Sequence, residues 1–171
     1  MLKMLSKKNE KEILVVREHG QLPLLHYPLL DQTGVVEHCF TTRLGGVSEG
    51  IYSTLNFSFT RGDNPEAVME NYRRVAETFG KTVDDFVCTD QTHTTNVLKV
   101  GKEALGYGVT KERPYTDVDG LITNESGVIL STFYADCVPL YFVDPVHKAI
   151  GLSHSGWRGT VGRMGQKTLE A

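Results

Sequence analysis

Two short apolar runs on either side of a tight turn constrain the fold of this 171-residue chain more than any other feature. Residues 140–143 and 149–153 are strand-like, and the Asp144-Pro145 pair between them is typical of a turn. The pattern predicts a β-hairpin. Cys137 and His154 stand at the ends of these two runs, where side chains of neighbouring strands can meet over a sheet edge.

The rest of the sequence reads as short strands with few helices. Residues 64–79 form the clearest helical pattern, because Asn64 suits an N-cap, Pro65 suits the first helical position and Gly80 follows the apolar stripe. A second helix is expected over residues 159–171. The remaining strand-like runs are residues 12–17, 35–41, 86–92, 97–100, 120–123 and 128–134. Since strands and helices do not alternate regularly, we expect an α+β fold around a mixed or antiparallel β-sheet.

A chain of this length fits a single domain, which we place at residues 12–171. Residues 1–11 are a charged segment without the apolar stretch of a signal peptide, and we expect them to be mobile. The helical pattern at residues 159–171 stops without a glycine C-cap, a proline or a closing basic turn. Either this helix frays into solvent, or the chain lacks a continuation and the C-terminal part of the domain is absent.

The composition argues against several classes of partner. A net charge of −3 and a pI of about 6.1 give no basic field for nucleic acid or for an anionic membrane surface. No apolar run approaches the roughly 18 residues that a membrane helix needs. Three cysteines without a CxxC pair argue against a disulfide framework and favour a reducing compartment. We expect a cytoplasmic protein, whose oligomeric state the composition does not indicate.

His93 closes another strand-like run and completes a possible ligand set with Cys137 and His154. Zinc accepts cysteine sulfur and histidine nitrogen, and a catalytic zinc commonly keeps three protein ligands and one open position. The spacing of the three residues matches no local zinc-finger motif. The residues alone therefore leave open a buried core thiol and structural histidines, or Cys137 as a nucleophile with His154 as its base.

Three further polar residues are candidates for catalysis or phosphate binding. Asp136 is the carboxylate nearest to Cys137 in sequence and is a candidate general acid/base, but in an extended segment it would point away from the thiol. Arg43 lies in a glycine-dense loop at residues 42–50, and Arg158 lies at the start of the final helix. Either guanidinium could clamp a phosphate, or be merely structural. Trp157 is expected in the core or at a hinge.

Five segments, in one order along the chain, carry a resemblance to a known family. They are residues 40–48 (FTTRLGGVS), 91–93 (QTH), 119–123 (DGLIT), 135–139 (ADCVP) and 154–159 (HSGWRG). Together they resemble the YfiH/DUF152 family, also called the laccase-domain or polyphenol-oxidase family. The resemblance runs from about Val35 to the C-terminus, and its last two motifs are the most specific.

The resemblance implies a single YfiH-like domain that holds zinc through His93, Cys137 and His154. It also implies purine nucleoside phosphorylase and adenosine deaminase activities, with purine nucleosides and phosphate as the ligands. Phosphorolysis would act on adenosine, inosine, guanosine or methylthioadenosine. A Zn²⁺ with an open position lowers the pKa of a bound water toward about 7, which suits the hydrolytic deamination of adenosine.

Some positions depart from the family pattern. Thr92 and Thr94 flank His93 where relatives read Gln-Val-His-Gly, and Ser155 stands where alanine is favoured. Asn56, a candidate substrate-binding residue, is followed by Phe-Ser in place of the family's Leu-Gly or Leu-Ser. These changes keep the ligand atoms. Family members are longer than this chain, so part of the substrate pocket is expected to lie outside it.

Three alternatives to a zinc nucleoside enzyme stand beside it. A copper-dependent phenol oxidoreductase is suggested by the older family name, and His₂Cys is also a blue-copper ligand set. The chain has only six histidines, however, and His26, His38 and His147 are poorly placed for a multicopper centre. A metal-free Cys/His hydrolase would resemble deamidating cysteine toxins at the level of the fold. The last alternative is a non-catalytic interaction protein.

Overall fold

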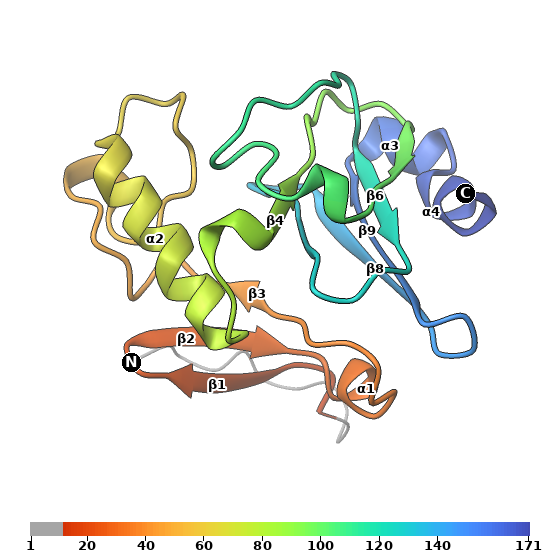
Figure 1. Cartoon of the computed structure of the whole chain (residues 1–171), viewed down its shortest axis with the longest axis horizontal. Coiled ribbons are helices and arrows are strands. Elements are labelled where there is room, and N and C mark those ends of the chain that lie inside the picture. Colours follow the sequence, from red (N-terminus) through yellow and green to blue (C-terminus); the bar gives the residue numbers. More distant parts are fainter. Residues whose placement is uncertain (1–11) are drawn as a thin grey trace.

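The computed structural model describes residues 12–171, so the expectation for residues 1–11 lies outside the described part. Short strands form three sheets, and helices cover their faces (Figure 1). The first sheet is antiparallel in the order β1 (Val15–His19), β2 (Leu22–His26) and β3 (Phe40–Thr41). A parallel pair joins β4 (Phe86–Cys88) to β7 (Ile129–Ser131). The expected α+β class with mixed and antiparallel sheets is confirmed.

The third sheet is mixed, in the order β5-β6-β9-β8. It contains β5 (Val97–Lys99), β6 (Gly120–Thr123), β8 (Val138–Asp144) and β9 (Ala149–Ser155). The hairpin predicted from the apolar runs is formed by β8 and β9, with Asp144 paired to Ala149 at the turn. At the other end Pro139 pairs with His154, which brings the Cys137 segment beside the histidine.

Four α-helices and three 3-10 turns complete the described chain. They are α1 (Pro28–Asp31), η1 (Gly50–Tyr52), α2 (Pro65–Thr78), η2 (Val83–Asp85), η3 (Lys102–Ala104), α3 (Trp157–Val161) and α4 (Met164–Glu170). The helix α2 confirms the prediction for residues 64–79. The Asn64 side chain caps it by accepting a hydrogen bond from the Glu66 N–H at 2.9 Å, and Gly80 follows its C-cap with a φ of +62°.

A single buried strand, β4, is shared by two hydrophobic clusters. Phe86 and Cys88 point into the cluster that α2 forms with the first sheet, where Tyr72 is almost fully buried. Val87, between them, points into the second cluster with Leu121 of β6. This alternation is what a strand buried on both faces requires. The segment that leaves β4 and carries His93 is therefore anchored at its start by both clusters.

Several predicted element bounds differ from the structure. The first strand lies at Val15–His19 instead of residues 12–17, and residues 35–39 form no strand. Residues 35–39 could pair with the first sheet only if the strand β2 continued beyond His26. It does not continue, because Pro28 has no N–H and begins α1. The strand β2 itself was not predicted.

The predicted strand at residues 86–92 and the final helix are also shorter than expected. The strand ends at Cys88, because the following residues turn toward β6. The final helix is broken into α3 and α4 at Arg163, which has a φ of +60°. After this break Met164 and Thr168 are buried against β9, where Thr168 Oγ1 lies 2.8 Å from Ser153 Oγ.

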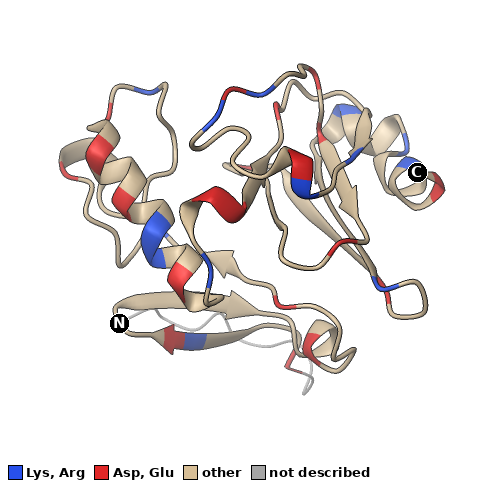
Figure 2. Ribbon diagram, in the orientation of Figure 1, with Lys and Arg blue, Asp and Glu red and all other residues tan. Residues whose placement is uncertain are grey.

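Charged residues of both signs are scattered along the described chain, while the strands of the third sheet carry few of them (Figure 2). Within residues 12–171, the structure contains no helix that is both long and apolar enough to cross a membrane.

Two buried histidines lie side by side, one at the end of β2 and one in the segment that leads into β3. His26 and His38 are 7% and 6% exposed, and the Tyr27 N–H donates to His38 Nε2 at 2.7 Å. In the described part of the chain, His26 Nε2 and His38 Nδ1 have no hydrogen-bond partner. Burial lowers the pKa of both histidines, and the Arg17 charge lowers it further, against an opposing effect of Asp31.

The lowered pKa values predict acid sensitivity. Below the ordinary histidine pKa of about 6.5 the unfolded chain binds more protons than the folded one, so the free energy of unfolding should fall as the pH drops from about 6.5 to about 5. Urea titrations at several pH values measure this slope. His26→Leu should flatten it, whereas His147→Gln should change it far less, because the pair of His147 with Asp144 is exposed at a turn. A stability that is constant over this range would contradict the prediction.

Candidate metal centre

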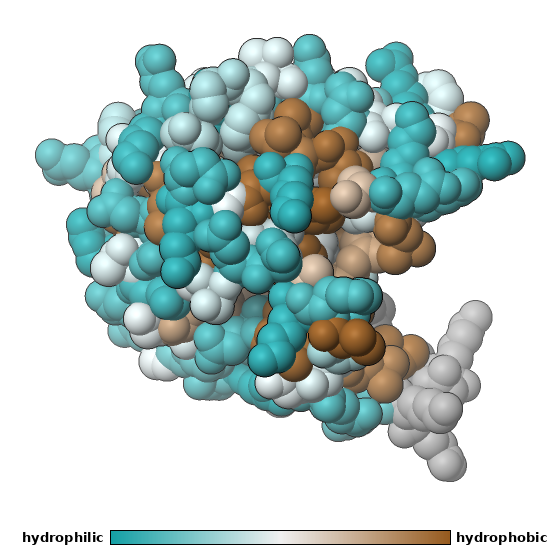
Figure 3. Space-filling view, turned by 45° about the vertical axis from the view of Figure 1, so that its right-hand side comes forward, coloured by the Kyte–Doolittle hydropathy of each residue, from teal (hydrophilic) through white to brown (hydrophobic). Residues whose placement is uncertain are grey.

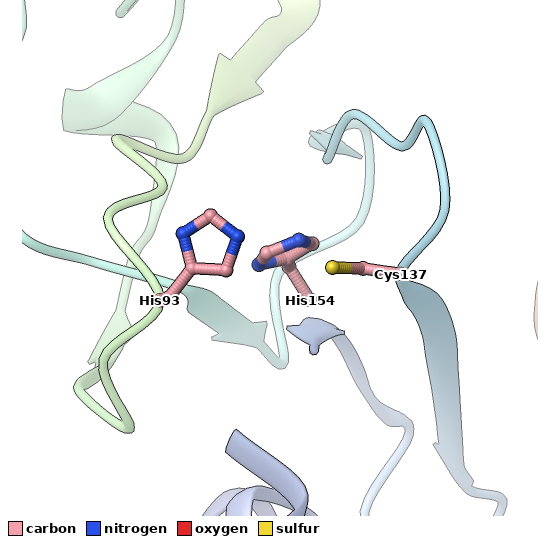
Figure 4. Close-up of side chains that lie close together, drawn as sticks. All are labelled: His93, Cys137 and His154. Atoms are coloured by element: carbon pink, nitrogen blue, oxygen red, sulfur yellow. The ribbon is translucent and has the colours of Figure 1, made fainter. Parts of the chain in front are cut away.

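Three side chains from distant parts of the sequence meet at one point of the fold. Each of His93, Cys137 and His154 offers a ligand atom, and these atoms all lie within 4.8 Å of one another. Figure 4 shows the rings of the two histidines and the thiol turned toward a common space. Donor atoms around a tetrahedral zinc stand about 3.5 Å apart, given bond lengths of about 2.0–2.3 Å. Small side-chain rotations would therefore close the set around one ion.

Each of the three residues comes from a different local structure. His154 lies in β9 and is buried, Cys137 immediately precedes β8 and is half-buried, and His93 is exposed on the loop that follows β4. The His93 backbone is left-handed, with a φ of +67°. The predicted convergence of these residues is thus present, and their role as metal ligands remains a prediction.

Asp119, whose role the sequence analysis did not identify, lies directly behind the site. Its side chain is 0% exposed, and its Oδ1 lies 2.8 Å from His154 Nδ1. Because Nδ1 is engaged by the carboxylate, Nε2 is the nitrogen with which His154 can face the thiol. Burial would raise the pKa of Asp119, but hydrogen bonds from His154 and Thr94 outweigh it, so that the pKa is lowered.

The same carboxylate also accepts hydrogen bonds from the loop that carries His93. The backbone N–H groups of Thr92, His93 and Thr94 donate to it at 3.1, 3.1 and 2.8 Å, and Thr94 Oγ1 donates at 2.9 Å. The only sequence signal for Asp119 was its place at the start of the 119–123 motif. One buried carboxylate therefore contacts both histidine-bearing segments.

Gln91 joins the His93 loop to the segment that leads to Cys137. Its Nε2 donates to the Phe133 carbonyl at 2.6 Å, and its Oε1 accepts from the Phe133 N–H at 2.7 Å. Thr89 Oγ1 donates to the same Oε1 at 2.8 Å. The amide thus pairs with both backbone groups of Phe133 as a neighbouring strand would, just beyond the end of the β4–β7 ladder. Its motif position was noted in the sequence, but this contact was not foreseen.

Gly156 provides the space that the site needs. A Cβ atom at this position would lie 2.8 Å from Cys137 Sγ and 3.2 Å from His93 Cδ2. Its φ of −82° is accessible to any residue, so the glycine is required by the close approach of the two side chains and not by the backbone conformation.

Asp136 lies beside the thiol, contrary to the extended-strand expectation. Residues 135–137 form a bend, and Cys137 Sγ lies 3.7 Å from Asp136 Oδ1. Partial burial and the nearby Asp136 and Asp119 carboxylates raise the pKa of the Cys137 thiol. A free Cys137 is accordingly less ionised than an ordinary cysteine, which disfavours spontaneous nucleophilic reactivity.

Two predicted substrate-binding residues line the same cleft as the candidate ligands. The cleft has a volume of about 1620 Å³ and is bordered by His93, Cys137, His154, Arg43 and Asn56. Figure 3 shows the molecule hollowed on this side, with apolar residues inside the hollow. The Arg43 guanidinium donates from Nε and Nη2 to the Ser53 carbonyl at 3.0 and 2.5 Å.

Asn56 is held within its own loop and by α2. Its Nδ2 donates to Asp63 Oδ2 at 2.8 Å, and its carbonyl accepts from Asn71 Nδ2 at 2.8 Å. The buried Asn71 of α2 also accepts a hydrogen bond from the Val47 N–H at 2.9 Å. The helix thereby fixes the glycine-dense loop that carries Arg43.

Arg158 and Trp157 do not border this cleft. Trp157 is 73% exposed, so the expectation of a core position is wrong, and the Arg158 guanidinium lies 5.5 Å from its ring centre. The short α3 begins at Trp157 and turns this side chain outward, because Gly156 and Gly159 occupy the buried side.

His26, Asp31 and His38 form a second group whose possible ligand atoms lie within 4.8 Å of one another. The Tyr27 N–H, however, donates to His38 Nε2, so a neutral His38 ring carries its proton on Nδ1. That proton blocks Nδ1 as a metal ligand. The first cluster has no such obstacle and is the better candidate centre.

Comparison with known proteins gives consistent matches. The model of a family described as multi-copper polyphenol oxidoreductase laccase matches residues 37–171. A purine nucleoside phosphorylase of Deinococcus radiodurans is 44% identical to the chain over 149 residues, which cover 87% of this chain and 53% of the relative. The chain therefore spans about half the length of the curated relatives that it matches.

Solved structures share the fold. The crystal structure of YlmD from Geobacillus stearothermophilus gives a TM-score of 0.77 at 36% identity, over 90% of this chain and 56% of that chain. A Bacillus licheniformis hypothetical protein, YfiH, gives a TM-score of 0.74 at 32% identity, over 85% of this chain and 53% of that chain. The predicted YfiH-like fold is confirmed.

The crowding at Gly156 yields a test of the site. In Gly156→Ala the new methyl group should displace Cys137 or His93 and weaken zinc binding at least tenfold, which competition with a chromophoric chelator measures. Gly165→Ala is the matched control, because its Cβ would meet Leu140 only at 3.8 Å, an ordinary contact. Equal zinc affinity of the two variants would show that these three side chains do not share an ion.

Proposed function

Because this chain belongs to the family described as multi-copper polyphenol oxidoreductase laccase, the laccase-domain or YfiH/DUF152 family, we propose that it is a zinc-dependent enzyme acting on purine nucleosides. The observation that carries the proposal is the His93, Cys137 and His154 cluster at the wall of a cleft. Relatives named purine nucleoside phosphorylase point to the substrate class.

The proposed reaction is phosphorolysis of adenosine, inosine, guanosine or methylthioadenosine, with hydrolytic deamination of adenosine as a second activity. Phosphorolysis needs an anion-binding group beside the nucleoside. Arg43 meets this need, because it borders the cleft and, within residues 12–171, its guanidinium donates only to the Ser53 carbonyl. On release from Ser53, the fork of N–H groups would bind phosphate bidentately.

Zinc fits the donor set better than a multicopper assembly. Two imidazoles and one thiolate leave a fourth position open, as in catalytic zinc sites. A blue centre coupled to a histidine-rich cluster needs more histidines than this cleft presents. His147 is on an exposed turn, and His26 and His38 form the separate buried group described above. The sequence expectation of zinc, with copper as the alternative, is therefore retained as a proposal.

The residues around such a site would have separate roles. When bound, the zinc supplies a Lewis acid and lowers the pKa of a bound water to about 7. Asp119 keeps the His154 ring oriented, and Gln91 keeps the Cys137 segment beside the His93 loop. Asp136, 3.7 Å from the thiol, is the carboxylate placed to accept or donate a proton there. Asn56 borders the cleft beside Arg43 as a second polar contact for substrate.

A metal-free hydrolase is the second candidate, and one observation favours it. Cys137, His154 and Asp119 have the order nucleophile, base and orienting carboxylate that cysteine hydrolases use. The raised pKa of the Cys137 thiol argues against it. Alkylation separates the two: zinc should protect Cys137 from iodoacetamide if it is a ligand, and labelling at an unchanged rate would favour the hydrolase.

The substrate proposal predicts distinct products. Metal-quantified protein incubated with adenosine should yield adenine and ribose 1-phosphate only when phosphate is present, and inosine when deamination occurs. Chromatography of the products, with and without phosphate, identifies the reaction. Zinc-loaded protein that turns over no purine nucleoside would refute the proposed function and support a non-catalytic role.

The ligand assignment predicts the behaviour of three variants. Cys137→Ala and His154→Ala should each lose bound zinc and activity, because two donors hold zinc far more weakly than three. Cys88→Ala should keep both, since Cys88 is buried in the core beside Tyr72. Zinc per chain is measured by plasma mass spectrometry. Full zinc occupancy in Cys137→Ala would show that the assignment is wrong.

A further inference from the structure

We propose that Asp119 is the positioning residue of the metal centre, preparing both histidines for the ion before it binds. The inference rests on the proposed function, because it concerns the same cluster. Asp119 belongs to neither of the segments that supply His93 and His154, since it precedes β6 in the middle of the third sheet. It can therefore hold both segments from a fixed point.

The first step concerns the His154 ring. A neutral imidazole carries one proton, and the nitrogen that bears it cannot bind a metal. The 2.8 Å contact to the Asp119 carboxylate fixes that proton on Nδ1. The lone pair then stays on Nε2, on the side of Cys137. Backbone pairing adds to this, because the His154 N–H donates to the Asp119 carbonyl at 2.7 Å.

The second step concerns the His93 loop. Three consecutive N–H groups of this loop converge on the carboxylate, in the manner of backbone concavities that bind anions. The loop has to curl around Asp119 for this, and His93 takes its left-handed backbone at the centre of the curl. Thr94 stands where family members have glycine, and its hydroxyl donates a further hydrogen bond to Asp119 Oδ2. The carboxylate thus determines where the His93 side chain leaves the backbone.

The third step concerns charge. Asp119 is completely buried, and His154 is its only ion-pair partner in the part of the chain that the structure describes. Isolated buried carboxylates are unfavourable unless hydrogen bonds and opposite charge compensate them. A divalent cation held by His154 would supply such a charge. Carboxylate–histidine–metal chains of this kind raise the basicity of the ligand and tighten binding.

The tautomer of His154 tests the first step without metal. Long-range ¹H–¹⁵N spectra of the metal-free wild type should show His154 protonated on Nδ1 and unprotonated on Nε2. A wild-type His154 that is protonated on Nε2 would overturn the proposal even if no variant folds.

Zinc affinity tests the whole proposal. Asp119→Asn should weaken zinc binding by about 10–100-fold in chelator competition, the range found for lost outer-sphere partners. Its amide removes the charge and turns a donor toward either the His154 ring or the loop N–H groups. Asp117→Asn is the matched control, because Asp117 is exposed, accepts from Thr92 Oγ1 and has a left-handed φ of +56° that asparagine tolerates. It should bind zinc as the wild type does.

The outcomes separate this inference from the proposed function. A wild type that binds zinc together with a folded Asp119→Asn of equal affinity overturns the inference and leaves the function standing. A wild type that binds zinc but turns over no nucleoside refutes the function, while a weaker Asp119→Asn still supports the positioning role. Circular dichroism confirms that each variant compared is folded.

Discussion

The buried carboxylate of Asp119 is the interaction on which the candidate site depends. It accepts hydrogen bonds from the His154 ring and from three successive N–H groups of the His93 loop. These donors belong to segments that are about sixty residues apart in the chain, and no strand pairs one with the other. A polar group at this depth is stable only when it is saturated with donors, so the loop and the ring must both be in place. The need to saturate the Asp119 carboxylate therefore also fixes the geometry of His93 and His154, the two possible histidine ligands.

The hydrophobic core positions this network from the opposite side. The buried strand β4 contributes to both hydrophobic clusters, and the loop bearing His93 begins where this strand ends. The hairpin of β8 and β9 brings Cys137 beside His154 through the pairing of Pro139. Strand β4 and the β8–β9 hairpin therefore both end at the candidate site, which lies at the wall of the cleft. Arg43 reaches the same cleft because Asn71 of α2 holds the loop that carries it.

The sequence predicted those parts of the structure in which local pattern and tertiary packing agree. The hairpin turn at Asp144-Pro145 and the cap at Asn64 are local signals, and both were confirmed. The meeting of Cys137 and His154 followed from the hairpin. The core position expected for Trp157 was wrong because hydrophobicity alone predicts burial, while the backbone of α3 turns this side chain outward.

The support of the site could not be predicted, because it depends on contacts between distant segments. Nothing near Asp119 in the sequence indicates that its oxygens face residues 92–94, and the bend that brings Asp136 to the thiol has no local signature. The amide of Gln91 has a broader consequence. By imitating a peptide unit opposite Phe133, it prolongs a ladder with a side chain in place of main chain. The segments that carry His93 and Cys137 are therefore joined by a side-chain contact that does not depend on the length of the turns around it.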